Sequence, residues 1–244
     1  MPIRLEQLDW IEFGKLVPKK MDTVILPIGT VEAHGVISLS TDTLIPMYIA
    51  EKIADNFSAI IAPPIHYGIT RTMYGFAGSL TVSSETFEKY ITELIFSFAD
   101  KEFRKIVLIN GHGGHIDELK NVAWKVNRER KVKIAVIHWW MLCEDIVQEV
   151  YGQVGGHGGL DETAAVLAID KNYVHQKNYK KSLVYPGRKG LFAIPPPTPL
   201  MPYRWGEGEP NFDIKKAKVY MNKVIKKIEE YLKEVFQGWK KLEK

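Results

Sequence analysis

The chain has 244 residues, 45% of them apolar and 25% charged, which fits one large domain with a substantial core. No stretch approaches the roughly 20 apolar residues of a membrane span, and the first residues lack the order of a signal peptide. The net charge of +4 is concentrated in residues 212–244, where ten Lys accompany five acidic residues. No other basic stripe is present, so neither a membrane nor a nucleic acid is expected as a partner.

Cysteine and lysine usage bear on the origin of the protein. The single cysteine, Cys143, cannot form an internal disulfide, which predicts a cytoplasmic location. Lys outnumbers Arg 26 to 7 and Gln occurs only five times. Together with abundant Ile and Glu, this bias is typical of a thermophilic source.

Four short apolar runs rich in β-branched residues predict buried strands, at residues 23–28, 59–62, 106–109 and 134–137. Helical patterns lie between them at residues 44–54, 87–103 and 116–126. Pro46 falls in the expected first turn of one helix, and Ser84 with Thr86 supplies capping candidates for the next. Strands that alternate with helices predict an α/β fold, in which helices flank a mainly parallel sheet within one domain spanning residues 1–244.

The second half of the chain predicts helices at residues 141–150 and 161–168 and a long amphipathic helix at the end. Between them, residues 185–210 are rich in Pro and Gly and too long for an ordinary connection. This stretch is either a loop over a functional site or an oligomer contact. The final helix is expected to pack on the sheet through one apolar face, formed by Val224, Ile225, Ile228, Leu232, Val235 and Phe236.

Polar side chains gather where the predicted strands end, which is where open α/β sheets bind ligands. Glu32 and His34 follow the first strand, and their spacing points both side chains the same way if the segment is extended. Asp42 precedes the next helix. His112 and His115 follow the third strand in the glycine-rich sequence NGHGGH.

A later glycine-rich sequence, GGHGGLDET, adds His157, Asp161 and Glu162 at the start of a helix. Each cluster alone has a structural explanation, such as a surface pair, a glycine turn or a helix cap. Their joint placement after strands favours a site for Zn, Mn or Fe. Two such ions that share a carboxylate would polarise a carbonyl and activate water. No cysteine, G-x-S-x-G or Walker motif accompanies these clusters.

The sequences LPIGTVEAHG…STD, NGHGGH and GGHGGLDET resemble the three signature blocks of the creatininase (creatinine amidohydrolase) family. Residues 76–87, FAGSLTVSSETF, also resemble the family segment before its second long helix, and the agreement runs from about residue 5 to 170. The resemblance implies an α/β fold, two divalent metal ions per chain and a homo-oligomer, commonly a hexamer. It implies an amidohydrolase that cleaves a C–N bond of a small-molecule amide with metal-activated water.

The resemblance also implies roles for individual residues. The metal ligands would be Glu32, His34, Asp42 and His112, with Asp42 as the bridge. Glu162 would be a further ligand or a catalytic carboxylate that acts on the water, and His157 the catalytic acid or base.

Substrate-binding candidates are Ser79, by the same resemblance, together with Trp140 and His115. Trp140 follows the fourth strand and forms either an apolar wall of the site or part of the core or an interface. His115 stands where the family often has Asn, and it either replaces a missing contact or caps the next helix.

Three features depart from the family pattern. Gly114 stands where creatininase has a glutamate ligand, Ile37 replaces a usual histidine, and the interval from Glu32 to Asp42 is one residue shorter. These departures leave the substrate open. One alternative is a formamidopyrimidine nucleotide deformylase of flavin or deazaflavin biosynthesis, with Arg71, Arg188 and Lys189 as conceivable phosphate ligands. Peptide trimming and a non-catalytic scaffold with a degenerate site are the others.

Overall fold

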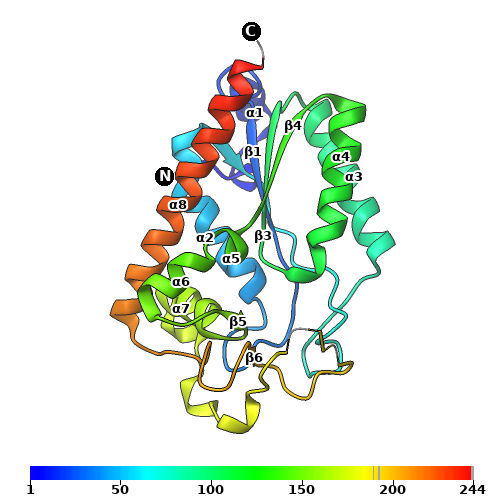
Figure 1. Cartoon of the computed structure of the whole chain (residues 1–244). Coiled ribbons are helices and arrows are strands. Elements are labelled where there is room, and N and C mark those ends of the chain that lie inside the picture. Colours follow the sequence, from blue (N-terminus) through cyan, green and yellow to red (C-terminus); the bar gives the residue numbers. More distant parts are fainter. Residues whose placement is uncertain (189, 192, 243–244) are drawn as a thin grey trace.

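Four parallel strands form the centre of the fold, which a computed structural model describes for residues 1–188, 190–191 and 193–242 (Figure 1). The strands are β1 (Thr23–Ile28), β2 (Ala59–Ile61), β3 (Lys105–Asn110) and β4 (Lys133–His138), in the order β2-β1-β3-β4. All neighbouring strands pair in parallel. Because helices cover both faces, the strands are continuous apolar runs. The predicted α/β fold with a parallel sheet is thus confirmed.

Two layers of helices cover the sheet (Figure 1). One face carries α2 (Thr41–Ile53), α5 (Trp139–Leu142), α6 (Glu144–Tyr151), α7 (Leu160–Ile169) and α8 (Ile214–Lys241). The other carries α1 (Trp10–Leu16), α3 (Ser84–Asp100) and α4 (Ile116–Arg130). Alternate residues of β1 serve the two layers: Ile25 packs in the first core, and Val24 and Leu26 pack in the second.

Some element ends differ from the predicted ones. The capping residue of α3 is Ser83 rather than Ser84 or Thr86, because the Ser83 side chain accepts the backbone N–H of Thr86. The predicted helix at 141–150 is divided at Cys143 into α5 and α6. In α8, Val235 is 40% exposed and therefore does not belong to the buried face.

The start of α2 places Asp42 close to the carboxyl end of the sheet. Since α2 begins at Thr41, Pro46 lies beyond its first turn and offers no N–H to the carbonyl of Asp42. That carbonyl faces the backbone at Gly29 and Gly111, where any Cβ atom would collide with it. Glycine at both strand ends therefore lets α2 place the Asp42 side chain directly beyond β1 and β3.

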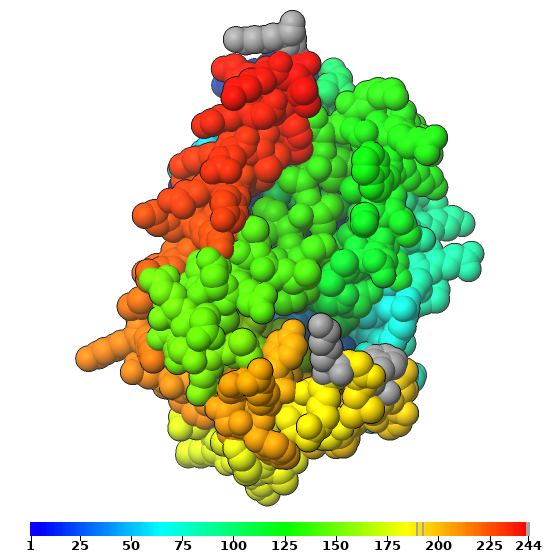
Figure 2. Space-filling model, viewed as in Figure 1, coloured from blue at the N-terminus to red at the C-terminus, as the bar shows by residue number. Residues whose placement is uncertain are grey.

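The long segment rich in Pro and Gly closes the carboxyl end of the sheet. Its strand β6 (Met201–Pro202) pairs antiparallel with β5 (Gly156–His157). In the space-filling view the yellow and orange segment lies directly below the green region of α5 and α6 (Figure 2). The segment thus lies beside the predicted site, as expected for a loop that covers it.

The 3-10 turns are short: Leu5–Gln7, Ala54–Phe57, Gly113–His115, Lys171–Tyr173, Gln176–Asn178 and Lys181–Leu183. Within the described part of the chain, no helix has the combined length and apolar character that crossing a bilayer requires.

Candidate metal centre

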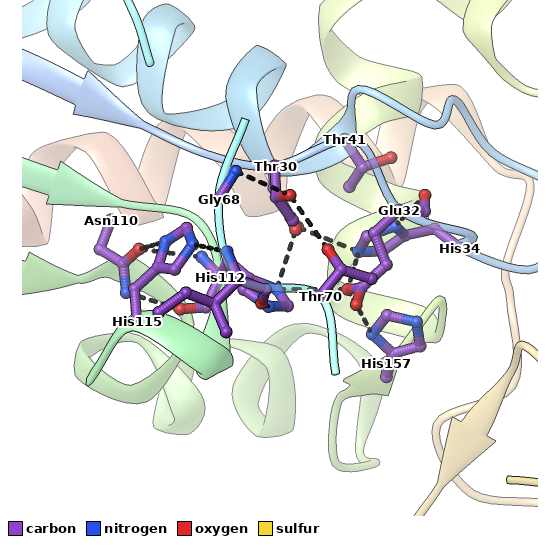
Figure 3. Close-up of polar contacts among 12 residues, drawn as sticks. Thr30, Glu32, His34, Thr41, Gly68, Thr70, Asn110, His112, His115 and His157 are labelled. Carbon is purple, nitrogen blue, oxygen red and sulfur yellow. Dashed lines mark hydrogen bonds and ion pairs between the residues drawn. The ribbon is translucent and has the colours of Figure 1, made fainter. Parts of the chain in front are cut away.

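The side chains predicted as ligands come from separate segments of the chain, and those of Glu32, His34 and His112 lie close together (Figure 3). Glu32 and His34 lie on the loop after β1, Asp42 lies in the first turn of α2, and His112 follows β3. Glu32, His34 and Asp42 are each no more than 2% exposed. Buried charged and polar groups of this density need partners, which their mutual contacts only partly supply.

Asp42 lies between two imidazoles. Its Oδ1 is 2.9 Å from Nε2 of His34, and its Oδ2 is 3.0 Å from Nδ1 of His112. The two carboxylate oxygens therefore face two different histidines on opposite sides of one group. This is the arrangement expected of a carboxylate that bridges two ions.

Two further carboxylates lie near the two histidines that flank Asp42. Oε2 of Glu32 is 3.2 Å from Nδ1 of His112, and Oε2 of Glu162 is 3.8 Å from Nε2 of His34. Glu162 lies in the first turn of α7. Two groups able to hold an ion result, one of Glu32, Asp42 and His112 and one of His34, Asp42 and Glu162. They share Asp42.

His157 belongs to a third such group, with Glu32 and His34. Its Nδ1 is 3.9 Å from Oε2 of Glu32, and its side chain is 20% exposed. His157 can therefore contact both the cluster and a bound molecule. Asp161 does not join these groups, since its Oδ1 accepts the N–H of Gly156 and supports β5.

Backbone carbonyls orient all three imidazoles. Nδ1 of His34 lies 2.9 Å from the Glu32 carbonyl, and Nε2 of His112 lies 2.7 Å from that of Ile69. Nε2 of His157 lies 2.8 Å from the Ala33 carbonyl. Because a carbonyl only accepts, each of these nitrogens carries the proton. In a neutral ring the other nitrogen then offers its lone pair to the cluster, as metal ligation requires.

The cluster fits divalent metal ions in two respects. Within the described residues, Oε2 of Glu32, Nε2 of His34 and Oδ2 of Asp42 are buried, and their polar contacts are the ion pairs within the cluster itself. A buried polar atom left unsatisfied costs about 1–3 kcal/mol, so these atoms need either the protons of the histidines or a bound cation between them. The donor set is imidazole nitrogen and carboxylate oxygen without thiolate, which suits Zn, Mn or Fe.

The buried carboxylates and imidazoles of the cluster shift one another's pKa values. Burial opposes the charged form of His34, but Asp42, Glu162 and Glu32 raise its pKa to about 10. Burial likewise opposes the ionised form of Asp42, yet His34 and His112 hold its pKa below the usual range. The pairing of Asp42 with His34 and His112 therefore favours the charged form of all three groups.

Three other groups have a pKa shifted in the direction that burial favours, toward the neutral form. Burial, reinforced by the positive charge of His34, lowers the pKa of His157 to about 4, so this imidazole is neutral near pH 7. Burial raises the pKa of Glu162 to about 8, although His34 partly opposes this shift. Burial also raises the pKa of Cys143 to about 12, which makes the thiol unreactive.

A cavity of about 760 Å³ opens onto the cluster. Trp140 contributes to its wall, which is one of the two positions that the sequence analysis considered for this residue. Glu32, His34, Asp42, His112, His157 and Glu162 all line it. Its apolar side chains come from the loop after β2, from α5 and α6, and from the long loop: Ile69, Met73, Trp140, Met141, Val147, Ile194, Met201 and Tyr203.

Two predicted substrate-binding residues lie elsewhere. Ser79 is not among the lining residues; its hydroxyl accepts the N–H of Ala33 and so supports the loop that carries Glu32 and His34. His115 is fully buried outside the cavity wall, and its side chain does not cap α4. His115 occupies the N-cap position of α4 without a side-chain capping bond, and its role as a substrate contact stays a prediction.

The positions that depart from the family pattern are explained by their surroundings. A Cβ atom on Gly114 would lie 2.6 Å from Nε2 of His112 and 2.7 Å from the carbonyl oxygen of Ile69. The hydrogen bond between these two groups occupies the space of a side chain. Ile37 is 5% exposed and packs in the hydrophobic core. Glu162 supplies a carboxylate to the cluster without any side chain at position 114.

Sequence reasoning overlooked Asn110, which stands at the start of NGHGGH. Its side chain accepts the N–H of His112 and donates to the carbonyl of the same residue. It also contacts Nδ1 of His138 at 2.9 Å. The position of Asn110 in the NGHGGH motif could have indicated this role. An asparagine that is buried at the end of a strand needs hydrogen-bond partners, and the nearby histidines can provide them.

Together, the fold and the cluster define an α/β protein with a carboxylate–imidazole centre at the carboxyl end of a parallel sheet. Comparison with known proteins agrees with this class. The sequence pattern of the Creatininase family, described as creatinine amidohydrolase, matches residues 6–208. The chain therefore belongs to the creatininase family.

Two relatives show the range of activities in similar proteins. Creatinine amidohydrolase from Pseudomonas putida is 26% identical over 182 residues, covering 67% of this chain and 70% of the relative. A mycofactocin precursor peptide peptidase from Mycolicibacterium smegmatis (strain ATCC 700084 / mc(2)155) is 34% identical over 158 residues, covering 62% of this chain and 59% of the relative.

Solved creatininase structures share the fold. One creatininase crystal structure matches with a TM-score of 0.79 at 20% identity, covering 96% of this chain and 98% of that chain. A creatininase variant of the Zn–Zn type matches with a TM-score of 0.76 at 19% identity, and a Mn form matches with a TM-score of 0.75 at 21% identity. Each match covers 97% of this chain and 99% of the solved chain.

Proposed function

We propose that this protein is a metal-dependent hydrolase of a C–N bond, with two divalent ions per chain. One ion would be held by His34, Asp42 and Glu162, and the other by Glu32, Asp42 and His112. The observation that carries the proposal is the position of Asp42, whose two oxygens face His34 and His112 at 2.9 and 3.0 Å. Zn and Mn forms of solved creatininases support the choice of metals.

The bound ions would supply Lewis acidity toward a substrate carbonyl and a water molecule. The protein residues would orient the reactants and move protons. His157 is neutral, its Nε2–H is held by the Ala33 carbonyl, and its Nδ1 is free to take a proton and return it to the leaving nitrogen. Glu162 is assigned as a ligand because its Oε2 faces His34 from the fixed first turn of α7.

The cavity supports a substrate larger than creatinine. Its volume of about 760 Å³ lies in the range of pockets that enclose drug-sized ligands, about 300–1,000 Å³. Its walls are largely apolar, with Trp140, Val147 and Tyr203 around the cluster. An amide within a longer molecule, such as the end of a peptide, would fill this space better than a single small ring.

Peptide trimming is therefore the second candidate function, and the mycofactocin precursor peptide peptidase relative adds to it. The nucleotide deformylase alternative has less support. Arg71 lines the cavity, but its guanidinium is 2.8 Å from Glu118. Arg188 is exposed and not among the lining residues, and Lys189 lies outside the described residues. A non-catalytic scaffold would not need carboxylates and imidazoles buried together beside an open cavity.

The test uses protein reconstituted separately with Mn, Fe and Zn. Each form is incubated with creatinine, with a set of short peptides, or with a formamidopyrimidine nucleotide, and the products are identified by mass spectrometry. Water addition to creatinine, release of a terminal residue or release of formate each identifies one activity. Full metal occupancy without turnover of any of these amides would contradict the proposed substrate classes, and absence of metal binding would contradict the proposed centre.

A further inference from the structure

His115 is linked to the metal ligand His112 through the backbone of a residue more than 40 positions earlier in the chain. The N–H of Ile69 donates to Nε2 of His115 at 3.0 Å, and the C=O of Ile69 accepts from Nε2 of His112 at 2.7 Å. Ile69 is 1% exposed, so water cannot replace either contact. One buried residue thus uses both of its backbone polar groups on the two histidines of NGHGGH.

His115 is itself held in one orientation. Its Nδ1 lies 3.2 Å from Oδ1 of Asn110, and its ring stacks on Phe87 with centroids 4.2 Å apart and an interplanar angle of 17°. Gly68 packs so closely on the ring that any Cβ atom there would collide with Nε2. Since Nε2 accepts from Ile69, the proton of the neutral ring is on Nδ1, directed at Asn110 (Figure 3).

The segment on either side of Ile69 is anchored, but not at Ile69. The N–H of Gly68 donates to Oγ1 of Thr30 at 3.2 Å, and the N–H of Thr70 donates to Oγ1 of Thr81 at 2.9 Å. These contacts tie the loop to its neighbours and leave the Ile69 groups to the two imidazoles. Without His115, the Ile69 N–H would be buried and unpaired, and the backbone would rotate to find another acceptor.

We propose that His115 is a positioning residue: acting through Ile69, it holds the carbonyl that fixes the ring orientation and tautomer of the metal ligand His112. The inference rests on the proposed metal centre. It assigns to the second histidine of NGHGGH a role that requires contact with neither metal nor substrate. Groups that orient metal ligands in this way typically contribute about 10–100-fold to metal affinity.

The experiment measures metal affinity by competition with a chromophoric chelator, and the ligand field by the visible spectrum of the Co²⁺ form. His115→Phe keeps the stacking on Phe87 but removes the acceptor for Ile69. We expect its affinity to fall about 10–100-fold, with an altered Co²⁺ spectrum. His115→Gln places an amide oxygen near the former Nε2 and is expected to restore most of the affinity. His66→Phe, at an exposed histidine outside the cavity wall, is the matched control.

Each outcome has one meaning. If His115→Phe is folded by circular dichroism and keeps wild-type affinity and spectrum, His115 is a core residue only and the inference is wrong. If His115→Phe does not fold, His115→Asn, which is too short to reach Ile69, must bind metal more weakly than His115→Gln; equal affinities overturn the inference. If the wild-type protein binds no metal, the proposed centre fails and this inference with it.

Discussion

The imidazole of His34 lies against that of His157, with ring centroids 4.3 Å apart and planes inclined by 38°. The two rings have different surroundings despite this contact. Nε2 of His34 faces Asp42 at 2.9 Å, whereas Nδ1 of His157 has Glu32 as its nearest carboxylate, at 3.9 Å. These surroundings agree with the roles proposed above, in which His34 is a ligand and His157, neutral at the cavity wall, transfers protons.

Removal of His157 separates these two roles. We expect His157→Gln to keep two metal ions per chain and to lower kcat about 100- to 10,000-fold, the usual contribution of a general acid or base. Metal content by mass spectrometry and turnover are measured on the same preparation. A variant that loses one ion would show that His157 is a ligand instead.

Asp42→Ala is expected to remove both ions and all activity, since each proposed ion depends on one of its oxygens. The matched control is Asp117→Ala, which removes an exposed carboxylate from α4. Its metal content should equal that of the wild type. Normal metal content in Asp42→Ala would refute the bridging role.

Metal uptake is expected to release protons. In the metal-free protein the pKa of His34 is raised to about 10 and that of His112 is raised as well, so both rings are protonated near pH 7. An ion must displace these protons, because only the neutral ring ligates. Affinity should therefore fall as pH falls, by about 10-fold per pH unit for each proton released. Calorimetric titration in buffers of different ionisation enthalpy counts these protons, and a count of zero would contradict the assignment.

Metal removal is expected to destabilise the fold, because the ions would join α2, α7 and the loops after β1 and β3. At a metal concentration 100 times Kd, the free energy of unfolding should rise by about 2.7 kcal/mol for one site. Thermal unfolding with added metal and with a chelator measures the difference. Identical Tm values under both conditions would mean that the ions do not bind the native centre.

Gly114→Ala is expected to weaken metal binding, since its Cβ atom would lie 2.6 Å from Nε2 of His112 and displace the Ile69 carbonyl. The neighbouring Gly113→Ala is a stringent control, because a Cβ atom there meets nothing within 4 Å. We expect an affinity loss of about 10-fold or more for Gly114→Ala and no change for Gly113→Ala. Equal affinities would show that the His112–Ile69 hydrogen bond is not required.

Local sequence patterns were sufficient to predict the α/β class, the four strands and the segments that meet at their carboxyl ends. These features depend on local periodicity and on motifs of a few residues, such as the one that carries Glu32 and His34. The ends of the helices were predicted less accurately. The cap of α3 at Ser83 depends on one side-chain contact, and several nearby residues could have made such a contact.

Packing between distant segments determines which histidine of NGHGGH faces the cluster. His112 and His115 have similar neighbours in the sequence. The orientations of their rings depend on Gly68 and Ile69, which belong to the loop after β2. Likewise, Ser79 supports a ligand loop instead of lining the cavity. Contacts between segments far apart in the chain leave no local pattern, and so the choice between ligand, support and substrate contact required the packed structure.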